Sequence, residues 1–164
     1  MRTVRLPSYE LLHKLFVVNN GELFRKKKVS NNTNVGDKVG TLTSTGYKQV
    51  KVNRIAHACH HIIYKMIYNK EVILLDHIDG NRANNKIENL REATVSQNSI
   101  NSKKKNNISD CKNVVWQKSR NNYIVKLHLH GKQKYFGEFK DVELADLVAQ
   151  EARNKYFGSF ARHS

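Results

Sequence analysis

The side chains with the most chemical potential lie in one stretch, LLDHIDGNRANNKIENLREATVSQN, residues 74–98. A carboxylate and an imidazole are adjacent at Asp76 and His77. Amide side chains follow at Asn81, Asn84, Asn85, Asn89 and Asn98. Carboxylate and amide oxygens suit a hard divalent cation such as Mg²⁺, and a histidine can take a proton from water near neutral pH. These residue types suit metal-assisted hydrolysis of a phosphodiester.

The surrounding residues predict how these groups are held. The apolar run before Asp76 predicts a short buried strand, and Asp79-Gly80-Asn81 is typical of a tight turn. A second short strand is expected over residues 90–93, followed by a helix with Thr94 as its N-cap. Neighbours on a strand point to opposite faces, so Asp76 and His77 can flank a phosphate from its two sides.

The quoted residues resemble the HNH homing-endonuclease family, the ββα-metal nucleases common in phages and mobile introns; the resemblance covers about residues 45–100. It implies that His77 is the general base and that Asp76 and Asn98 bind one Mg²⁺ (or Mn²⁺) ion. It also implies a middle asparagine that braces the loop, either Asn89 or the other candidate, Asn85.

The same family usually has His-Arg at the start of an upstream helix. Here His60 matches the histidine and His61 replaces the arginine, so His60 is expected to lie near the site in a structural role. A zinc cluster of His57, His60 and His61 is the alternative, but no cysteine pair lies nearby to support it.

The net charge of +15 predicts a polyanionic partner, for which double-stranded DNA is our choice. Basic residues greatly outnumber acidic ones in residues 1–56 and 99–140, whereas residues 57–98 are balanced. Codon bias in an A·T-rich genome is the competing explanation, because it would enrich both Lys and Asn. The position of the basic segments on both sides of the neutral centre favours nucleic acid.

The chain is expected to be α+β, with a nuclease domain at 1–98, a basic linker at 99–110 and a second small domain at 111–164. Residues 1–56 predict short strands and turns, including a hairpin turn at Asn20-Gly21. HACHHIIYKMIYNKEV predicts a short amphipathic helix. The second domain predicts three strands and then a helix capped by Asp141.

Residues 114–161 resemble the AP2 DNA-binding domain, through the aromatic after a valine, YFGEF, the Ala-rich helix and the closing FGSFA. The resemblance implies a three-stranded antiparallel sheet in the DNA major groove with the helix behind it. Strand alternation predicts the side chains that face DNA. These are Trp116, Lys118, Arg120, Lys126, His128, Gln133 and Tyr135. A core position for Trp116 is equally compatible with the sequence.

Lys103, Lys104 and Lys105 in the linker are interpreted as contacts to the DNA backbone rather than a solvated run. Tyr47, Gln49 and Lys51 form one face of a predicted strand, which is either a further DNA contact or plain solvent exposure.

Together these features predict a site-specific DNA endonuclease that leaves 5′-phosphate and 3′-hydroxyl ends and nicks one strand as a monomer. A DNA-binding regulator with an inactive nuclease unit and a ribosomal-type RNA-binding protein are the alternatives. No apolar run is long enough to span a membrane and no signal peptide is recognisable, so we expect a cytoplasmic protein, in a phage-infected bacterial host, that is not secreted.

Overall fold

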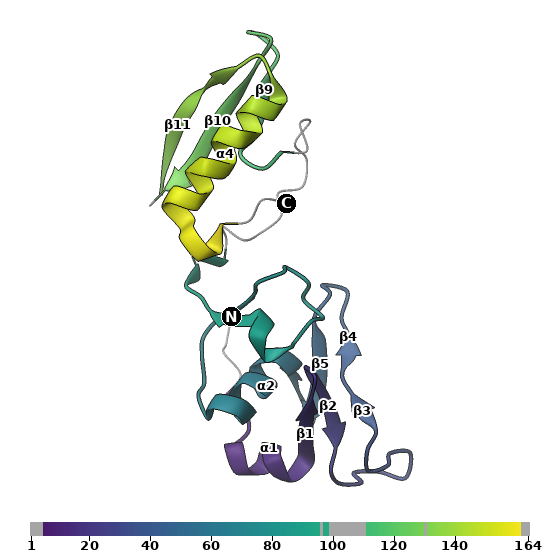
Figure 1. Ribbon diagram of the computed structural model, residues 1–164. Coiled ribbons are helices and arrows are strands. Elements are labelled where there is room, and N and C mark those ends of the chain that lie inside the picture. The colour runs from purple at the N-terminus through teal and green to yellow at the C-terminus, as the bar shows by residue number, and fades with distance from the viewer. Residues whose placement is uncertain (1–4, 96, 99–110, 130, 162–164) are drawn as a thin grey trace. The chain divides into compact units, whose positions relative to one another are not determined.

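The computed structural model describes residues 5–95, 97–98, 111–129 and 131–161. The chain separates into two compact units, Met1–Thr94 and Val95–Ser164, and each is described by itself. Within the described residues the fold is mixed α and β, with three α-helices and several small antiparallel sheets (Figure 1). The predicted linker at 99–110 and Lys103, Lys104 and Lys105 lie outside the described residues.

The first unit begins with a helix, α1 (Tyr9–Leu15), so the expectation of strands and turns alone in residues 1–56 is wrong. Ser8 caps this helix, because its side chain accepts a hydrogen bond from the backbone amide of Leu11 at 3.2 Å. Leu12 is fully buried in the main core of the unit, which accounts for the stability of so short a helix.

Two three-stranded antiparallel sheets follow α1. The first contains β1 (Phe16–Asn19), β2 (Glu22–Arg25) and β3 (Lys38–Val39). The second contains β4 (Thr41–Leu42), β5 (Lys48–Val52) and β6 (Ile55–Ala58). The predicted turn between β1 and β2 is confirmed: Asn20 and Gly21 both have positive φ, as a two-residue hairpin turn requires.

The predicted amphipathic helix is α2 (Cys59–Tyr68). Its buried Ile62 and Ile63 pack in one core with Phe16 and Leu23 from the first sheet and Val50 from the second. The helix therefore fixes both sheets to the segment that follows it, which carries Asp76 and His77.

That segment forms a two-stranded antiparallel sheet of β7 (Leu75–His77) and β8 (Leu90–Glu92), joined by a long loop that ends in a short 3₁₀ turn, η1 (Ile87–Asn89). Leu75 and Leu90 pack on Tyr64 of α2 in a small core of their own. This packing anchors the two strands to the rest of the unit.

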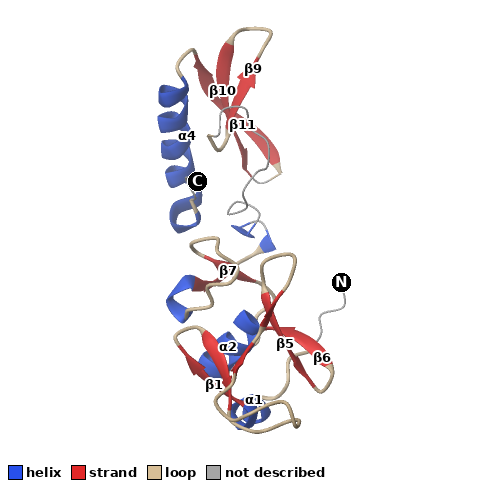
Figure 2. Ribbon diagram, turned by 90° about the vertical axis from the view of Figure 1, so that its right-hand side faces the viewer, coloured by secondary structure: helices blue, strands red, loops and turns tan. Residues whose placement is uncertain are grey.

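The second unit contains a three-stranded antiparallel sheet, β9 (Val114–Gln117), β10 (Asn122–Leu129) and β11 (Lys132–Phe139), with β10 in the centre. Helix α4 (Val142–Phe157) lies along one face of it (Figure 2), and the turn η2 (Gly158–Phe160) follows. The predicted cap is confirmed, because Asp141 accepts hydrogen bonds from the amides of Glu143 and Leu144.

The core of the second unit lies between this sheet and the helix. Val114, Val125 and Leu127 meet the alanines of α4 at positions 145, 149 and 152. Small alanines let the helix axis approach the sheet closely, and the large β-branched and leucine side chains fill the space between them. No helix among the described residues is long and apolar enough to cross a membrane.

Candidate active site

Asp76 and His77 lie at the end of β7, and both are buried, with exposed fractions of 5% and 4%. Cross-strand pairing places Asp76 opposite Arg91 on β8. The Arg91 guanidinium donates to the Asp76 carboxylate through Nε at 2.8 Å and Nη2 at 2.6 Å, both to Oδ2. A buried carboxylate is stabilised in its charged form by such a pair. Arg91 therefore holds the Asp76 carboxylate in one orientation.

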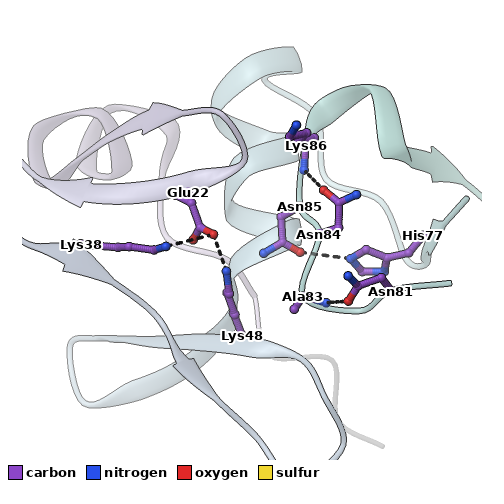
Figure 3. Close-up of polar contacts among 9 residues, drawn as sticks. All are labelled: Glu22, Lys38, Lys48, His77, Asn81, Ala83, Asn84, Asn85 and Lys86. Atoms are coloured by element: carbon purple, nitrogen blue, oxygen red, sulfur yellow. Dashed lines mark hydrogen bonds and ion pairs between the residues drawn. The ribbon is translucent and has the colours of Figure 1, made fainter. Parts of the chain in front are cut away.

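The His77 ring contacts Asn85, the other candidate for the middle asparagine. Its Nε2 lies 3.1 Å from Oδ1 of Asn85, and the Asn85 side chain points toward the ring (Figure 3). Asn85 is only 2% exposed. An amide oxygen accepts from a protonated Nε2, and the second ring nitrogen, Nδ1, is then the proton-accepting one.

Asn89 holds the two ends of the loop together. Its Oδ1 accepts from the backbone amide of Asp79 at 3.0 Å, and its Nδ2 donates to the Asp79 carboxylate at 2.9 Å and to the carbonyl of Asn84 at 2.8 Å. Asn84 also donates to Asp79, at 2.7 Å. Asn85 and Asn89 thus have different contacts: Asn85 bonds the imidazole, and Asn89 bonds the loop backbone.

The Asp79 carboxylate is the centre of this loop. Partial burial alone would raise its pKa, but hydrogen bonds from Asn84, Asn89 and the Asn81 amide outweigh it, and the pKa of Asp79 lies below its usual value. The loop is therefore braced by an ionised carboxylate at neutral pH.

Aromatic rings form the other side of the His77 environment. The His60 ring lies edge-on to His77, with centroids 5.0 Å apart, and the Tyr47 ring lies 5.9 Å from His77 and 5.3 Å from His60. Burial first, and then the neighbouring His61 and His77, lower the pKa of His60 to about 3. His60 is consequently neutral at physiological pH and adds no positive charge beside His77.

The donor set available to a metal consists of oxygens. Within the described ranges, no three His, Cys, Asp or Glu side chains form a group that could hold a metal ion. Asp76 provides a buried oxygen donor in the first unit, and Asn98, the other predicted ligand, belongs to the second unit. Mg²⁺ is commonly bound by one or two carboxylates with water and substrate phosphate. Asp76 is a ligand of the type that such a weakly held ion requires.

Three residues near the site were not assigned to it from the sequence. Arg91 could have been found from its position opposite Asp76 in the predicted strand pair. Tyr47 and Gly21 come from hairpins distant in sequence, and no local signal connects them to His77. Gly21 lies so close to the loop that a Cβ built on it would be 2.5 Å from the Lys86 amide nitrogen.

In the second unit, the sheet face away from α4 carries most of the predicted DNA-facing residues. Lys126 pairs across the strands with Tyr135, and His128 pairs with Gln133. The last three are exposed, and Lys126 is partly exposed. These four side chains therefore share the open face.

Lys118 and Arg120 lie in the exposed β9–β10 turn. Arg120 donates to Glu138 at 2.9 Å, so part of its charge is already neutralised. Of the two positions that the sequence left open for Trp116, the strand pairing favours the one on the core side. Trp116 is opposite Tyr123 and two residues from the buried Val114, which alternation puts on the helix side of the sheet.

Comparisons with known proteins fit this geometry. The sequence profile of a family described as "HNH endonuclease" matches residues 57–100. Protein 3.8 of Escherichia phage T7 is 37% identical over 91 residues, which is 54% of this chain and 73% of that protein. Residues 57–100 of this chain therefore match an HNH endonuclease domain. An uncharacterized HNH endonuclease of Acanthamoeba polyphaga mimivirus is 33% identical over 105 residues, 62% of this chain and about half (54%) of that relative.

The HNH match begins at His57, just before α2, and contains β7, the asparagine loop and β8. HNH nucleases act on DNA and typically use a divalent metal ion. Gly21 and Tyr47 lie outside the matched HNH residues, although both contact the site within the first unit. No solved structure matches this chain.

Proposed function

We propose that this protein is a metal-dependent DNA endonuclease in which His77 activates the attacking water. The observation that carries the proposal is the pairing of a buried His77 with Asn85, next to the buried, Arg91-bound Asp76. A neutral histidine whose Nε2 donates to Asn85 would accept a proton through Nδ1. That is the orientation that a general base needs.

Asp76 is the proposed metal ligand in the first unit, and the preferred ion is Mg²⁺, with Mn²⁺ as a substitute; Asn98, in the second unit, stays the second ligand predicted from the sequence. When bound, the ion stabilises the negative charge that develops on the leaving oxygen and on the phosphate. Asp76 has the charge and burial for this role, and Arg91 holds its carboxylate in place before the ion arrives. Asn89 keeps the loop closed around His77 through Asp79.

The reaction is an in-line displacement at phosphorus. His77 takes one proton from water, the resulting hydroxide forms a bond to phosphorus, and the bond from phosphorus to the 3′ oxygen breaks. The 3′ oxygen takes a proton from solvent water and His77 releases to solvent the proton it took, which leaves a 3′-hydroxyl and a 5′-phosphate. The rings of His60 and Tyr47 lie beside the base.

The second unit is proposed to bind double-stranded DNA in the manner of an AP2 domain and to give the cut its site specificity, as in homing-type enzymes. Support comes from the open sheet face, which carries Lys126, His128, Gln133 and Tyr135, and from the net charge of +15. With one HNH unit in the chain, a monomer would nick one strand.

A plasmid-relaxation assay tests the proposal. Wild type, Asp76→Ala and His77→Ala are incubated with supercoiled DNA carrying the gene's own flanking sequence, with Mg²⁺, Mn²⁺ or EDTA. Wild type should give nicked circles only with metal, and both variants should bind DNA without cutting it. Binding without cleavage by wild type, under every metal condition, would instead favour the DNA-binding regulator. Tighter binding to structured RNA than to duplex DNA would favour the RNA-binding alternative.

A further inference from the structure

Arg82 is an exposed cation held in a fixed position beside the site, and neither the HNH chemistry above nor loop bracing gives it a role. It lies in the loop between β7 and β8, three residues before Asn85. Its Nη1 donates to the carbonyl of Thr45 at 2.9 Å. Its guanidinium carbon lies 5.0 Å from the centroid of the Tyr47 ring.

The aliphatic part of the Arg82 side chain is held in place as well as its guanidinium. Gly46 has a φ of +85°, and a Cβ built there would lie 3.9 Å from both Cβ and Cδ of Arg82. The side chain therefore runs along the β4–β5 turn and ends over Tyr47. Long side chains on a surface normally lose considerable rotamer freedom when they bind a ligand. For Arg82 much of that ordering is already present.

Tyr47 connects this cation to the general base. The same ring that lies under the Arg82 guanidinium has its centroid 5.9 Å from the His77 ring. Arg82 and His77 are thus separated by one aromatic side chain. A phosphate placed for attack by a water on His77 comes within reach of a cation in this position.

The remaining donors of Arg82 are available for a ligand. A guanidinium has five N–H donors, and the hydrogen bond to Thr45 uses one. Among the described residues, Arg82 makes no ion pair with a carboxylate. By contrast, Arg91 and Arg120 both do. A side chain needed only to join the two loops would require neither the charge nor the exposure.

We propose that Arg82 binds the DNA backbone at the cleavage position, donating to a non-bridging oxygen of the phosphate that is cut or of its direct neighbour. Tyr47 is its positioning residue. The inference rests on the proposed nuclease function for the location of the phosphate. The contact itself requires only that the first unit binds DNA.

The test compares Arg82→Gln with Lys86→Gln. Glutamine at position 82 keeps a donor for Thr45 and loses the charge, and Lys86→Gln removes an equal charge from an exposed position of the same loop. Duplexes carrying a single uncharged methylphosphonate, moved one phosphate at a time, are bound in EDTA, so the readout does not depend on cleavage. The cut position is mapped separately with wild type.

Wild type should bind more weakly to the duplex with a methylphosphonate at one particular position than to the unmodified duplex. Arg82→Gln should bind these two duplexes with equal affinity. The slope of log affinity against log salt should fall by about 1 for Arg82→Gln, and kcat/KM should fall about 10- to 100-fold. Tyr47→Leu should reproduce the loss, and Tyr47→Phe should not, since the ring is retained.

The proposal would be overturned if Arg82→Gln and Lys86→Gln lowered the affinity for DNA equally and if, for both variants, this loss simply added to the loss caused by each methylphosphonate. The proposal would also be overturned if Arg82→Gln were non-additive only with a methylphosphonate several nucleotides from the mapped cut. If wild type binds but never cuts, the nuclease proposal fails, and coupling between Arg82 and one phosphate would still establish the contact. Circular dichroism of each variant separates these outcomes from loss of folding.

Discussion

Gly21 of the β1–β2 turn lies directly against the backbone of Asn85, the residue that bonds His77. A Cβ built on Gly21 would lie 2.7 Å from the Asn85 carbonyl carbon and 2.5 Å from the Lys86 amide nitrogen. Both are backbone atoms, so only a movement of the backbone could relieve the clash. Glu22, beside it, is ion-paired with Lys38 and Lys48, which fixes the hairpin to its neighbours (Figure 3). The N-terminal hairpin therefore sets the position of a site residue more than sixty positions away in sequence.

Gly21→Ala should displace Asn85 and lower kcat by about 10-fold or more, with little change in the affinity for DNA. Gly36→Ala is the matched control. Both glycines have positive φ, so both variants carry similar backbone strain, about 1 kcal/mol, but a Cβ on Gly36 meets nothing within 4 Å. Single-turnover cleavage and urea unfolding are measured for both. Equal losses of activity in the two variants would mean that the contact with Asn85 has no functional effect.

Asn85→Asp should move the acid limb of the pH–rate profile to higher pH. A carboxylate in place of the amide stabilises the protonated imidazolium of His77, and a protonated base cannot accept a proton from water. We expect a displacement of about 1 to 2 pH units, with activity partly recovered at alkaline pH. Asn85→Leu, which removes the acceptor, should lower activity at every pH without this displacement. An unchanged profile in Asn85→Asp would contradict the assigned His77–Asn85 contact.

His60 should make the first unit sensitive to acid. Its folded-state pKa is about 3 and its usual value is 6.5, so between these pH values the unfolded chain binds a proton that the folded chain does not. The contribution of His60 to the free energy of unfolding is therefore fully present above pH 6.5. Below pH 6.5 it decreases by about 1.4 kcal/mol for each unit that the pH falls. Burial also lowers the pKa of His57 and His61, in the same direction.

The free energy of unfolding is measured in urea at pH 7.5 and pH 5.0, with circular dichroism as the signal. Wild type should lose about 2 kcal/mol more over this interval than His60→Leu. Fluorescence of Trp116, the single tryptophan, follows the second unit separately and serves as the internal control. The same pH dependence in both proteins would show that His60 is not neutral in the folded state.

Lys126→Ala should weaken DNA binding about 5- to 10-fold and lower the salt dependence of log affinity by about 1. Lys126 lies on the open face of the second unit, opposite the exposed Tyr135. Lys155→Ala removes the same charge from α4, the helix that covers the other face, and should have a smaller effect. Fluorescence anisotropy with a labelled duplex measures both. A larger effect of Lys155→Ala would place the DNA on the helix side.

Features that depend on neighbouring residues could be predicted from the sequence. The Asn20-Gly21 turn, the Asp141 cap and the short strands around Asp76 and Leu90 all follow from local backbone preferences and periodicity. The adjacency of Asp76 and His77 is a covalent fact. Local preferences also misled in one place, because strand-like neighbours concealed the Ser8 cap at which α1 begins. For Trp116 they left both faces of the sheet open, and strand pairing puts it on the helix side.

Only the tertiary structure decided which side chains meet His77. Asn85 and Asn89 are alike in the sequence, and the choice between them depends on the path of an irregular loop, which is set by its packing against Gly21. Tyr47, His60 and Arg82 come together from a hairpin, a helix and a loop, through contacts that have no local signature. The residue types and spacing determined the chemistry available to this chain, whereas long-range packing determined which residues surround the base.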